Sequence, residues 1–420
     1  MGNTKRHMQK KIYILGGAQT DFSENWSRAN KSLFDLFSNA VLAGLENANL
    51  APKDIDVGHV GNFVAELFTG QGMLGGYFGH VHPDFSGMPS SRHEGACASG
   101  SLAILAAMSD IESGRYETAC VVGVELMRNV PGAIAAKNLG AAAWVGREAL
   151  GAKYLWPAMF SDLCEVYEAR YGLDYTHLSE ISKINFANGK NNPNAQTRKW
   201  DFSDKSFTQD NEANPVIEGW MRKQDCGQVT DGAAVIILAS EDRAAAYAKE
   251  RDIALEDIPY IKGWGHTTAP LMMKTKLEES AAIDSGNGYV FPWTRRAITD
   301  AYARAQISGP EELDAIETHD CFSITEYMAI EHFGLTEPGQ AWKAIEDGRI
   351  AMSGTLPINP SGGLIGLGHP VGATGVRMML DAAKQTTGRA GDMQVEDAKT
   401  VATYNVGGSG TTNVSFIVGV

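Results

Sequence analysis

The chain has 420 residues, of which 44% are hydrophobic and 20% charged, which fits a folded globular protein and excludes a disordered or fibrous one. Its formal net charge of −14 disfavours nucleic acid and anionic membrane surfaces as partners. Five cysteines without Cys-x-x-Cys spacing argue against a disulfide framework or a structural zinc site and indicate a reducing compartment. We therefore expect a cytoplasmic protein with no metal, no nucleic acid and no membrane as partner.

Strand and helix patterns alternate along the first 130 residues, which is typical of α/β architecture. The predicted elements are a strand at 11–20, a helix at 32–50, a strand at 56–64, a helix at 98–112 and a strand at 118–126. From about 128 to 225, Trp, Tyr, Asn and Met cluster with little periodicity. This region is predicted to be a long, partly helical insertion that forms a binding lid.

The remainder of the chain repeats the alternation. The predicted elements are a strand at 231–240 and helices at 241–252 and 290–307, then a strand at 314–322, helices at 323–335 and 368–389, and two strands within 400–419. The predicted organisation is an N-terminal half at 1–255, which includes the insertion, and a C-terminal half at 256–420.

A weak internal repeat supports two related halves. The segment CASGSLAILAAMSDIESGR followed by TACVVGVE parallels GATGVRMMLDAAKQTTGR followed by TVATYNVG. This alignment predicts that Cys97 and the turn around His369 lie at equivalent helix entrances, with small residues that let the two helices pack closely.

Cys97 stands immediately before the predicted helix at 98–112. Unpaired N–H groups and the helix dipole at such a position favour the thiolate, which is the nucleophilic form of cysteine. A buried structural cysteine is the alternative, because cysteine is among the most buried residue types.

Two further motifs supply titratable groups. His369 lies in a Gly-His-Pro turn at the start of a predicted helix, and THDCFS places His319 and Cys321 at the end of a predicted strand. Alternation along that strand puts these two side chains on one face and Asp320 on the other. The carboxyl ends of strands are where sites assemble in α/β proteins.

A glycine-rich turn at 405–413 offers backbone N–H groups to an oxyanion or a phosphate. Together with the cysteines and histidines, it suggests acyl transfer through a thioester. Thiols suit this chemistry because a thioester carbonyl accepts and releases thiolates readily.

These motifs resemble those of the thiolase superfamily over nearly the whole chain. CASGS looks like the nucleophile motif, GQVTDGAAVIIL like the strand closing the N-terminal half, and NPSGGLIGLGHPVGATG like the histidine motif. Ordinary thiolases carry an Asn-Glu-Ala-Phe motif and a late Cys-x-Gly motif. Here HDCF replaces the first and Asn405-Val406-Gly407 the second, a paired change that resembles the sterol-carrier-protein type of thiolase.

The resemblance implies two similar βαβαβαββ halves in a five-layered αβαβα arrangement with an inserted loop domain. It also implies cleavage of a 3-oxoacyl-CoA, or the reverse Claisen condensation, through an acyl group on Cys97. His369 would take the proton of Cys97, and the N–H groups of Cys97 and Gly407 would hold the oxyanion. His319 and His369 would hold the enolate oxygen, and Cys321 would protonate the enolate carbon.

No permanently bound cofactor is expected, because coenzyme A and acyl-CoA are substrates of the family. Candidates to meet the phosphates of coenzyme A are Arg147, Lys153, Arg222 and Lys223. The resemblance implies a homodimer or a dimer of dimers, and an accessory protein subunit is possible in this subgroup.

Three other interpretations stay open. The chain could be a condensing enzyme of the ketosynthase kind, which also uses one cysteine and two histidines. It could be a C-acyltransferase subunit that works with a partner protein on an acceptor other than coenzyme A. It could also be a non-catalytic acyl-CoA-binding protein with the thiolase fold.

Overall fold

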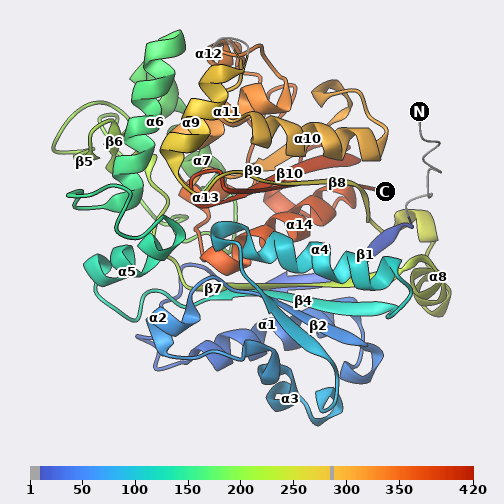
Figure 1. Ribbon diagram of the computed structural model, residues 1–420. Helices are drawn as coiled ribbons and strands as arrows, with labels where there is room; N and C mark the ends of the chain where they lie inside the picture. The colour runs from blue at the N-terminus through green and yellow to red at the C-terminus, as the bar shows by residue number, and fades with distance from the viewer. Residues whose placement is uncertain (1–9, 284–287) are drawn as a thin grey trace.

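Two similar units, shown in Figure 1, make up the computed structural model, which describes residues 10–283 and 288–420. In the first unit the strands lie in the order β3-β2-β4-β7-β1. Their bounds are β1 (Ile12–Gln19), β2 (Val57–Gly61), β3 (Ser90–His93), β4 (Thr118–Glu125) and β7 (Gly232–Ser240). The first three in the order run parallel, whereas β7 is antiparallel to both of its neighbours.

The second unit repeats this order with β9-β10-β11-β8. Their bounds are β8 (Tyr260–Thr268), β9 (Ala315–Thr318), β10 (Thr400–Gly407) and β11 (Thr412–Gly419). An isolated parallel bridge between Ile316 and Ile358 stands where β3 stands in the first unit. Two residue pairs between β1 and β8 join the units into one nine-stranded sheet, and the matched order confirms the two similar halves.

Helices form three of the five layers in Figure 1, with α4 and α14 between the two parts of the sheet. The helices of the first unit outside the insertion are α1 (Leu33–Ala48), α2 (Ala65–Thr69), α3 (Phe78–Val81), α4 (Ser99–Glu112) and α8 (Glu241–Glu250). Those of the second unit are α9 (Met273–Ala282), α10 (Pro292–Ala305), α11 (Ser323–Phe333), α12 (Ala341–Glu346), α13 (Gly363–Gly366) and α14 (Thr374–Thr386).

Strand β7 shows how the sequence pattern produces these layers. Its run GAAVIILA is buried on both faces. Val235 and Ile237 pack in the cluster beneath α1, whereas Ala234 and Ile236 pack in the cluster around α4 and α14. A strand covered on both sides needs a continuous apolar run, which is why this segment and β4 were recognisable without an alternating pattern.

Small residues let α4 and α14 approach closely, as the internal repeat predicts. A Cβ atom on Gly100 would lie 2.7 Å from the carbonyl oxygen of Gly372. One on Gly375 would lie 2.3 Å from Ser101 Oγ and 2.5 Å from Asn405 Oδ1. This contact brings the N-termini of the two helices together, and each is preceded by a single 3-10 turn.

The segment between β4 and β7 contains α5 (Gly132–Leu139), α6 (Leu155–Tyr171), α7 (Tyr175–Lys190), β5 (Val216–Glu218) and β6 (Met221–Arg222). It contacts the second unit, since α7 packs against α11 and α13. The limits proposed for this insertion at about 128–225, and for the halves at 1–255 and 256–420, remain predictions.

Candidate active site

Cys97 lies at the middle of the 3-10 turn Ala96–Ala98 that leads into α4. The preceding residue, Ala96, has a positive φ of 51°, a conformation that costs a non-glycine residue roughly 1 kcal/mol or more. Side chains at both ends hold this turn: Glu94 Oε1 accepts from the N–H of Ala96, and Ser99 Oγ accepts from the N–H of Gly95. The turn presents the thiol at the helix entrance.

His369 lies at the equivalent entrance of α14. Its N–H donates to Thr230 Oγ1 at 2.9 Å, and its Nδ1 lies 2.7 Å from Thr374 Oγ1. The Thr374 hydroxyl itself donates to the carbonyl oxygen of Pro370, so the Nδ1–H of His369 is the donor to Thr374. The remaining nitrogen, Nε2, is left with a free lone pair.

His319 follows the end of β9 and has the opposite tautomer. Its Nδ1 lies 3.1 Å from the amide nitrogen of Asn405 and 3.5 Å from the N–H of Val406, both of which donate. Asn405 also donates to the carbonyl oxygen of Cys97 and accepts from Ser101 Oγ, which fixes its orientation. Because Nδ1 accepts, Nε2 of His319 carries the proton.

The three groups converge. Ligating atoms of Cys97, His319 and His369 lie within 4.8 Å of one another, and the two imidazole rings are perpendicular with centroids 5.2 Å apart. Nε2 of each histidine is buried without a hydrogen-bond partner among residues 10–283 and 288–420. A thiol and two imidazoles could hold a metal ion by residue type, but the protonated Nε2 of His319 does not suit a ligand. The pair instead offers one proton acceptor and one proton donor beside a thiol.

Burial keeps this group of side chains uncharged. It raises the pKa of the Cys97 thiol to about 12, against the lowering effect of a hydrogen bond from the N–H of Gly408. It lowers the pKa of His369 to about 3, helped by the charge of Arg377, and that of His319 well below the ordinary value. The expectation that the helix entrance keeps Cys97 ionised is therefore wrong for the resting state, because desolvation outweighs the helix terminus.

Cys321 and Asp320 face different surroundings, as the alternation predicts. Cys321 lines the same cavity as Cys97, and burial raises the pKa of its thiol, with a further contribution from Cys97. Asp320 points away and accepts from the N–H groups of Leu364 and Ile365 at the start of α13. The second thiol is thus at the site while the carboxylate is structural.

The cavity lined by Cys97, Cys321 and His369 has a volume of about 150 Å³, and His319 is not among its lining residues. Its lining is mainly apolar and comes from both halves and from the insertion: Phe63, Cys97, Met127, Ala136, Leu139, Ala142, Trp156, Phe160, Gly227, Gln228, Val229, Cys321, Phe322, His369, Val371 and Gly408. None of these residues carries a formal charge at neutral pH, so the cavity suits an uncharged alkyl or acyl group.

The glycine-rich turn contributes Gly408 to the cavity wall, one residue after the predicted Gly407. Gly407 is the last residue of β10 and pairs with Thr412 of β11. Lys276 stabilises the turn: its buried ammonium group donates to Ser409 Oγ at 2.6 Å and to the carbonyl oxygen of Ser409 at 3.0 Å. Gly408 is therefore the turn residue whose N–H reaches the Cys97 sulfur.

The four predicted phosphate-binding residues lie outside this cavity. Arg147 and Lys153 are exposed. The guanidinium group of Arg147 lies over the ring of Trp144, and the ammonium group of Lys153 lies over the ring of Tyr154. Arg222 donates to Asn211 Oδ1 and to the carbonyl oxygen of Asn214, and Lys223 is exposed. Their assignment to coenzyme A remains a prediction.

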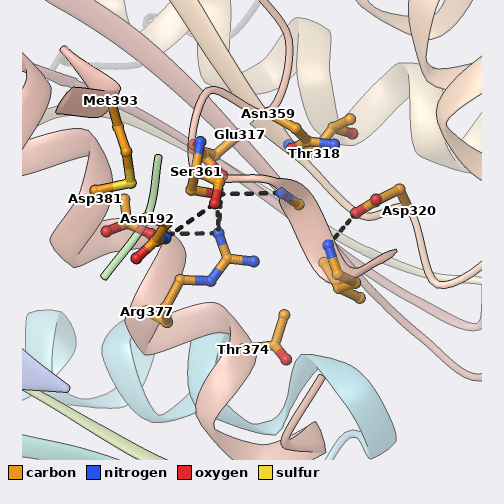
Figure 2. A network of polar contacts seen from close by, with 12 residues as sticks. Asn192, Glu317, Thr318, Asp320, Asn359, Ser361, Thr374, Arg377, Asp381 and Met393 are labelled. Carbon is orange, nitrogen blue, oxygen red and sulfur yellow. Dashed lines mark hydrogen bonds and ion pairs between the residues drawn. The ribbon is translucent and has the colours of Figure 1, made fainter. Parts of the chain in front are cut away.

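A buried polar network supports the two histidine-bearing segments from behind (Figure 2). Arg377 of α14 is fully buried and donates to Glu317 Oε2 at 2.8 Å, to Ser361 Oγ at 3.0 Å and to Asp381 Oδ2 at 3.4 Å. Glu317 lies on β9, two residues before His319, and Arg377 lies one turn after Thr374. The network therefore ties the strand that carries His319 to the helix that begins after His369.

Sequence reasoning did not assign roles to Asn405, Thr374 or Lys276. The sequence did indicate that Asn405 is a functional residue, since it stands where ordinary thiolases have the late cysteine. The indication for Thr374 was weaker: it lies four residues after Pro370, where the predicted helix begins. Lys276 had none, because a lysine in the charged segment MKTKLEES looks like any exposed helix residue.

This fold, with a thiol and an imidazole at paired helix entrances and a second imidazole after the end of β9, defines a thioester-forming acyl-transfer protein. Two family models match the chain: "Thiolase, N-terminal domain" over residues 12–185 and "Thiolase C-terminal domain-like" over residues 277–420. The chain belongs to the thiolase family, and its likeness to the sterol-carrier-protein type is confirmed by its relatives.

Two relatives are archaeal acetyl-CoA acetyltransferases. The one from Methanothermobacter thermautotrophicus is 31% identical over 406 residues, 96% of this chain and 97% of the relative. The one from Methanocaldococcus jannaschii is 33% identical over 408 residues, with 96% and 97% covered. Human sterol carrier protein 2 is 27% identical over 414 residues, 97% of this chain and 71% of the human protein.

Solved structures share the fold. The Ltp2-ChsH2(DUF35) aldolase superposes with a TM-score of 0.75 at 22% identity and covers 98% of both chains. The acetyl-CoA acetyltransferase from Syntrophomonas wolfei superposes with a TM-score of 0.69 at 17% identity and covers 98% of this chain and 99% of that one. The likeness to the acetyl-CoA acetyltransferase confirms the predicted thiolase fold.

Proposed function

We propose that this protein is a thiolase that cleaves a 3-oxoacyl-CoA with coenzyme A, or runs the reverse Claisen condensation, through an acyl group on Cys97. The observation that carries this proposal is the pair of opposite tautomers beside one thiol. His369 offers a lone pair at Nε2 and His319 offers an N–H, so one residue can accept the thiol proton and the other can stabilise an oxyanion.

In the first step the proton of Cys97 passes to His369 Nε2 as the sulfur attacks the 3-oxo carbon. The bond between C2 and C3 of the substrate then breaks, which leaves an acyl thioester on Cys97 and the enolate of acetyl-CoA. The N–H of Gly408 supports the oxygen at the attacked carbon, and His319 Nε2–H supports the enolate oxygen. One such donor is worth about 3 kcal/mol of transition-state stabilisation.

In the second step the Cys321 thiol protonates the enolate carbon, and acetyl-CoA leaves. Coenzyme A then attacks the thioester on Cys97. The thiol of coenzyme A gives its proton to the Cys321 thiolate, which becomes neutral again. The proton held by His369 passes to the departing sulfur of Cys97. The condensation direction uses the same groups in reverse, with the Cys321 thiolate as the base.

The test is turnover of acetoacetyl-CoA and coenzyme A to two molecules of acetyl-CoA by the purified protein, followed by chromatography of the thioesters. Acetyl-CoA formation together with an acetyl group on Cys97, detected by peptide mass spectrometry, is the expected result. Acetylation of Cys97 without turnover would point to a different acceptor. No acetylation would favour the non-catalytic acyl-CoA-binding protein.

Acylation of Cys97 by acetyl-CoA should change less than about twofold between pH 5.5 and pH 8. Because burial lowers the pKa of His369 to about 3, this base stays neutral as the pH falls through the whole range. An imidazole with the ordinary pKa of about 6.5 would instead lose about tenfold in its neutral form at pH 5.5. Rapid-quench measurement of acetyl-Cys97 formation, with circular dichroism to verify folding at each pH, gives the profile. An inflection near pH 6.5 would contradict the assignment.

A partner-dependent variant of the reaction is the second candidate. The name of the Ltp2-ChsH2(DUF35) aldolase joins two proteins, and this chain superposes on that structure along nearly its whole length. By this analogy an accessory subunit could present an acceptor other than coenzyme A to acylated Cys97. Loss of the acetyl group only in the presence of cell extract would support it.

We further propose a homodimer or a dimer of dimers in the cytoplasm, with coenzyme A and acyl-CoA as transient substrates. The human mitochondrial 3-ketoacyl-CoA thiolase, 15% identical, has been solved in complex with CoA, which supports the choice of substrate. Within residues 10–283 and 288–420, no helix is both long and apolar enough to cross a membrane.

A further inference from the structure

A second internal cavity lies beside the catalytic one. It has a volume of about 20 Å³ and is lined by Phe160, Phe291, Thr294, Thr325, Met328, Ala329, His332, Tyr404, Val406 and Gly410. The hydroxyl groups of its wall are hydrogen-bonded within the protein: Thr294 Oγ1 contacts Tyr404 and Asn413, and Thr325 Oγ1 donates to the carbonyl oxygen of Phe322. The imidazole of His332 also lines this cavity, and the rest of the wall is apolar.

Phe160 is the residue shared by the walls of both cavities. Its ring is 2% exposed and stacks on Phe322 with centroids 4.5 Å apart and an interplanar angle of 25°. Phe322 directly follows Cys321, so this pair of rings stands next to the reacting groups. On the far side, Val406 lines the second cavity and follows Asn405, the residue that holds Cys97 and His319.

We propose, resting on the proposed function, that Phe160 sets the acyl-chain length by closing the catalytic cavity against the second one. An apolar cavity of about 150 Å³ accepts a molecule of roughly the size of benzene, so the acyl group must be short. Removing the Phe160 ring joins the two cavities and makes room for further methylene groups. The substrates taken by the wild-type protein are therefore short, uncharged acyl chains.

The experiment compares wild type, Phe160→Ala and Phe160→Leu, with Phe186→Leu as a matched control. Phe186 is equally buried on the neighbouring helix α7 and stacks among other aromatic rings, but it lines neither cavity. The first readout is the ratio of kcat/KM for 3-oxooctanoyl-CoA to that for acetoacetyl-CoA. One methylene group in a fitting pocket is worth roughly 10- to 200-fold, so the ratio should rise at least about tenfold in Phe160→Ala.

A second readout does not need turnover. Alkyl methanethiosulfonates form a mixed disulfide with the Cys97 sulfur and release a sulfinate, and peptide mass spectrometry reports the rate at that cysteine. The ratio of hexyl to methyl labelling should also rise at least about tenfold in Phe160→Ala, less in Phe160→Leu, and stay unchanged in Phe186→Leu. Phe160→Leu keeps the test decisive where the alanine variant does not fold.

The outcomes separate the two proposals. Labelling that shifts in the Phe160 variants, while no variant turns over a 3-oxoacyl-CoA, would leave the cavity inference standing and overturn the proposed function. Turnover by the wild type, with neither ratio changed in folded Phe160 variants, would overturn the cavity inference alone. An equal shift in Phe186→Leu would also overturn the cavity inference, because Phe186 does not separate the two cavities.

Discussion

Cys97→Ala should abolish both acylation by acetyl-CoA and thiolysis of acetoacetyl-CoA, whereas Cys321→Ala should lose thiolysis but keep acylation. Removing a covalent nucleophile costs roughly 10⁶-fold in kcat, and removing a general acid costs roughly 10²- to 10⁴-fold. The difference arises because acylation by acetyl-CoA exchanges one thioester for another and requires no proton transfer to carbon. Thiolysis and condensation transfer a proton to or from carbon, which requires the second thiol. In acylation, the released coenzyme A thiolate can instead take the proton held by His369.

The two half-reactions are measured separately: release of one coenzyme A per Cys97 from acetyl-CoA, and full turnover of acetoacetyl-CoA. Cys226→Ala is the matched control, since Cys226 lies close to Phe322 in the fold but does not line the cavity. It should keep both activities. If Cys321→Ala retained thiolysis at the wild-type rate, another group would have to protonate the enolate and the division of roles between the two cysteines would be wrong.

Arg377→Met should lower the free energy of unfolding by about 3–5 kcal/mol, because it leaves buried carboxylates without their cation. Arg377 and Glu317 are both fully buried, and the guanidinium group is also bonded to Ser361 and Asp381. Denaturant unfolding followed by fluorescence gives the difference. The double variant Glu317→Gln/Arg377→Met should recover a large part of the loss, since it removes both partners of the pair.

The pH dependence of the Arg377→Met variant gives an independent check. Burial raises the pKa of Glu317 even with Arg377 present, and without the cation it must rise further. A carboxyl group whose pKa is higher in the folded than in the unfolded state stabilises the fold most when protonated, and this stability is lost as the pH rises. Because burial raises the wild-type pKa of Glu317 to about 7, the deficit of Arg377→Met relative to wild type should therefore shrink as the pH falls from about 9 to 7 and change little below pH 7. A deficit that grew over this range would contradict the uncompensated carboxylate.

Helices and strands with strong local patterns were predictable from the sequence. The continuous apolar runs of β4 and β7, the periodic helix α1 and the turn that leads into α14 are all found where the pattern placed them. Strands β3 and β8 were missed. The segment SSRH of β3 is short, polar and at the sheet edge, and β8 has glycines between its apolar residues. Neither has a run that burial on both faces would require.

The residues of the candidate site were also predictable, because glycine-rich turns and a Gly-His-Pro sequence at helix entrances are local features. Cys97, His319, Cys321 and His369 are brought together by the packing of the two halves. Their assigned roles stay predictions until the variants are measured. The phosphate-binding residues could not be chosen in this way, since a surface cation has no local signal for the ligand that it meets.

The sequence by itself determined the α/β class and the small set of side chains that can carry thioester chemistry, since both depend on local patterns, and its resemblance to the thiolase superfamily implied the five-layered architecture. Tertiary structure decided their protonation. A helix entrance favours a thiolate when considered alone, but burial from both halves raises the pKa of Cys97 to about 12. The opposite tautomers of the two histidines depend on Asn405 and Thr374, which reach them from different elements. Such contacts exist only after the two halves have packed, because desolvation and hydrogen-bond partners are set by the surroundings and not by the residue type.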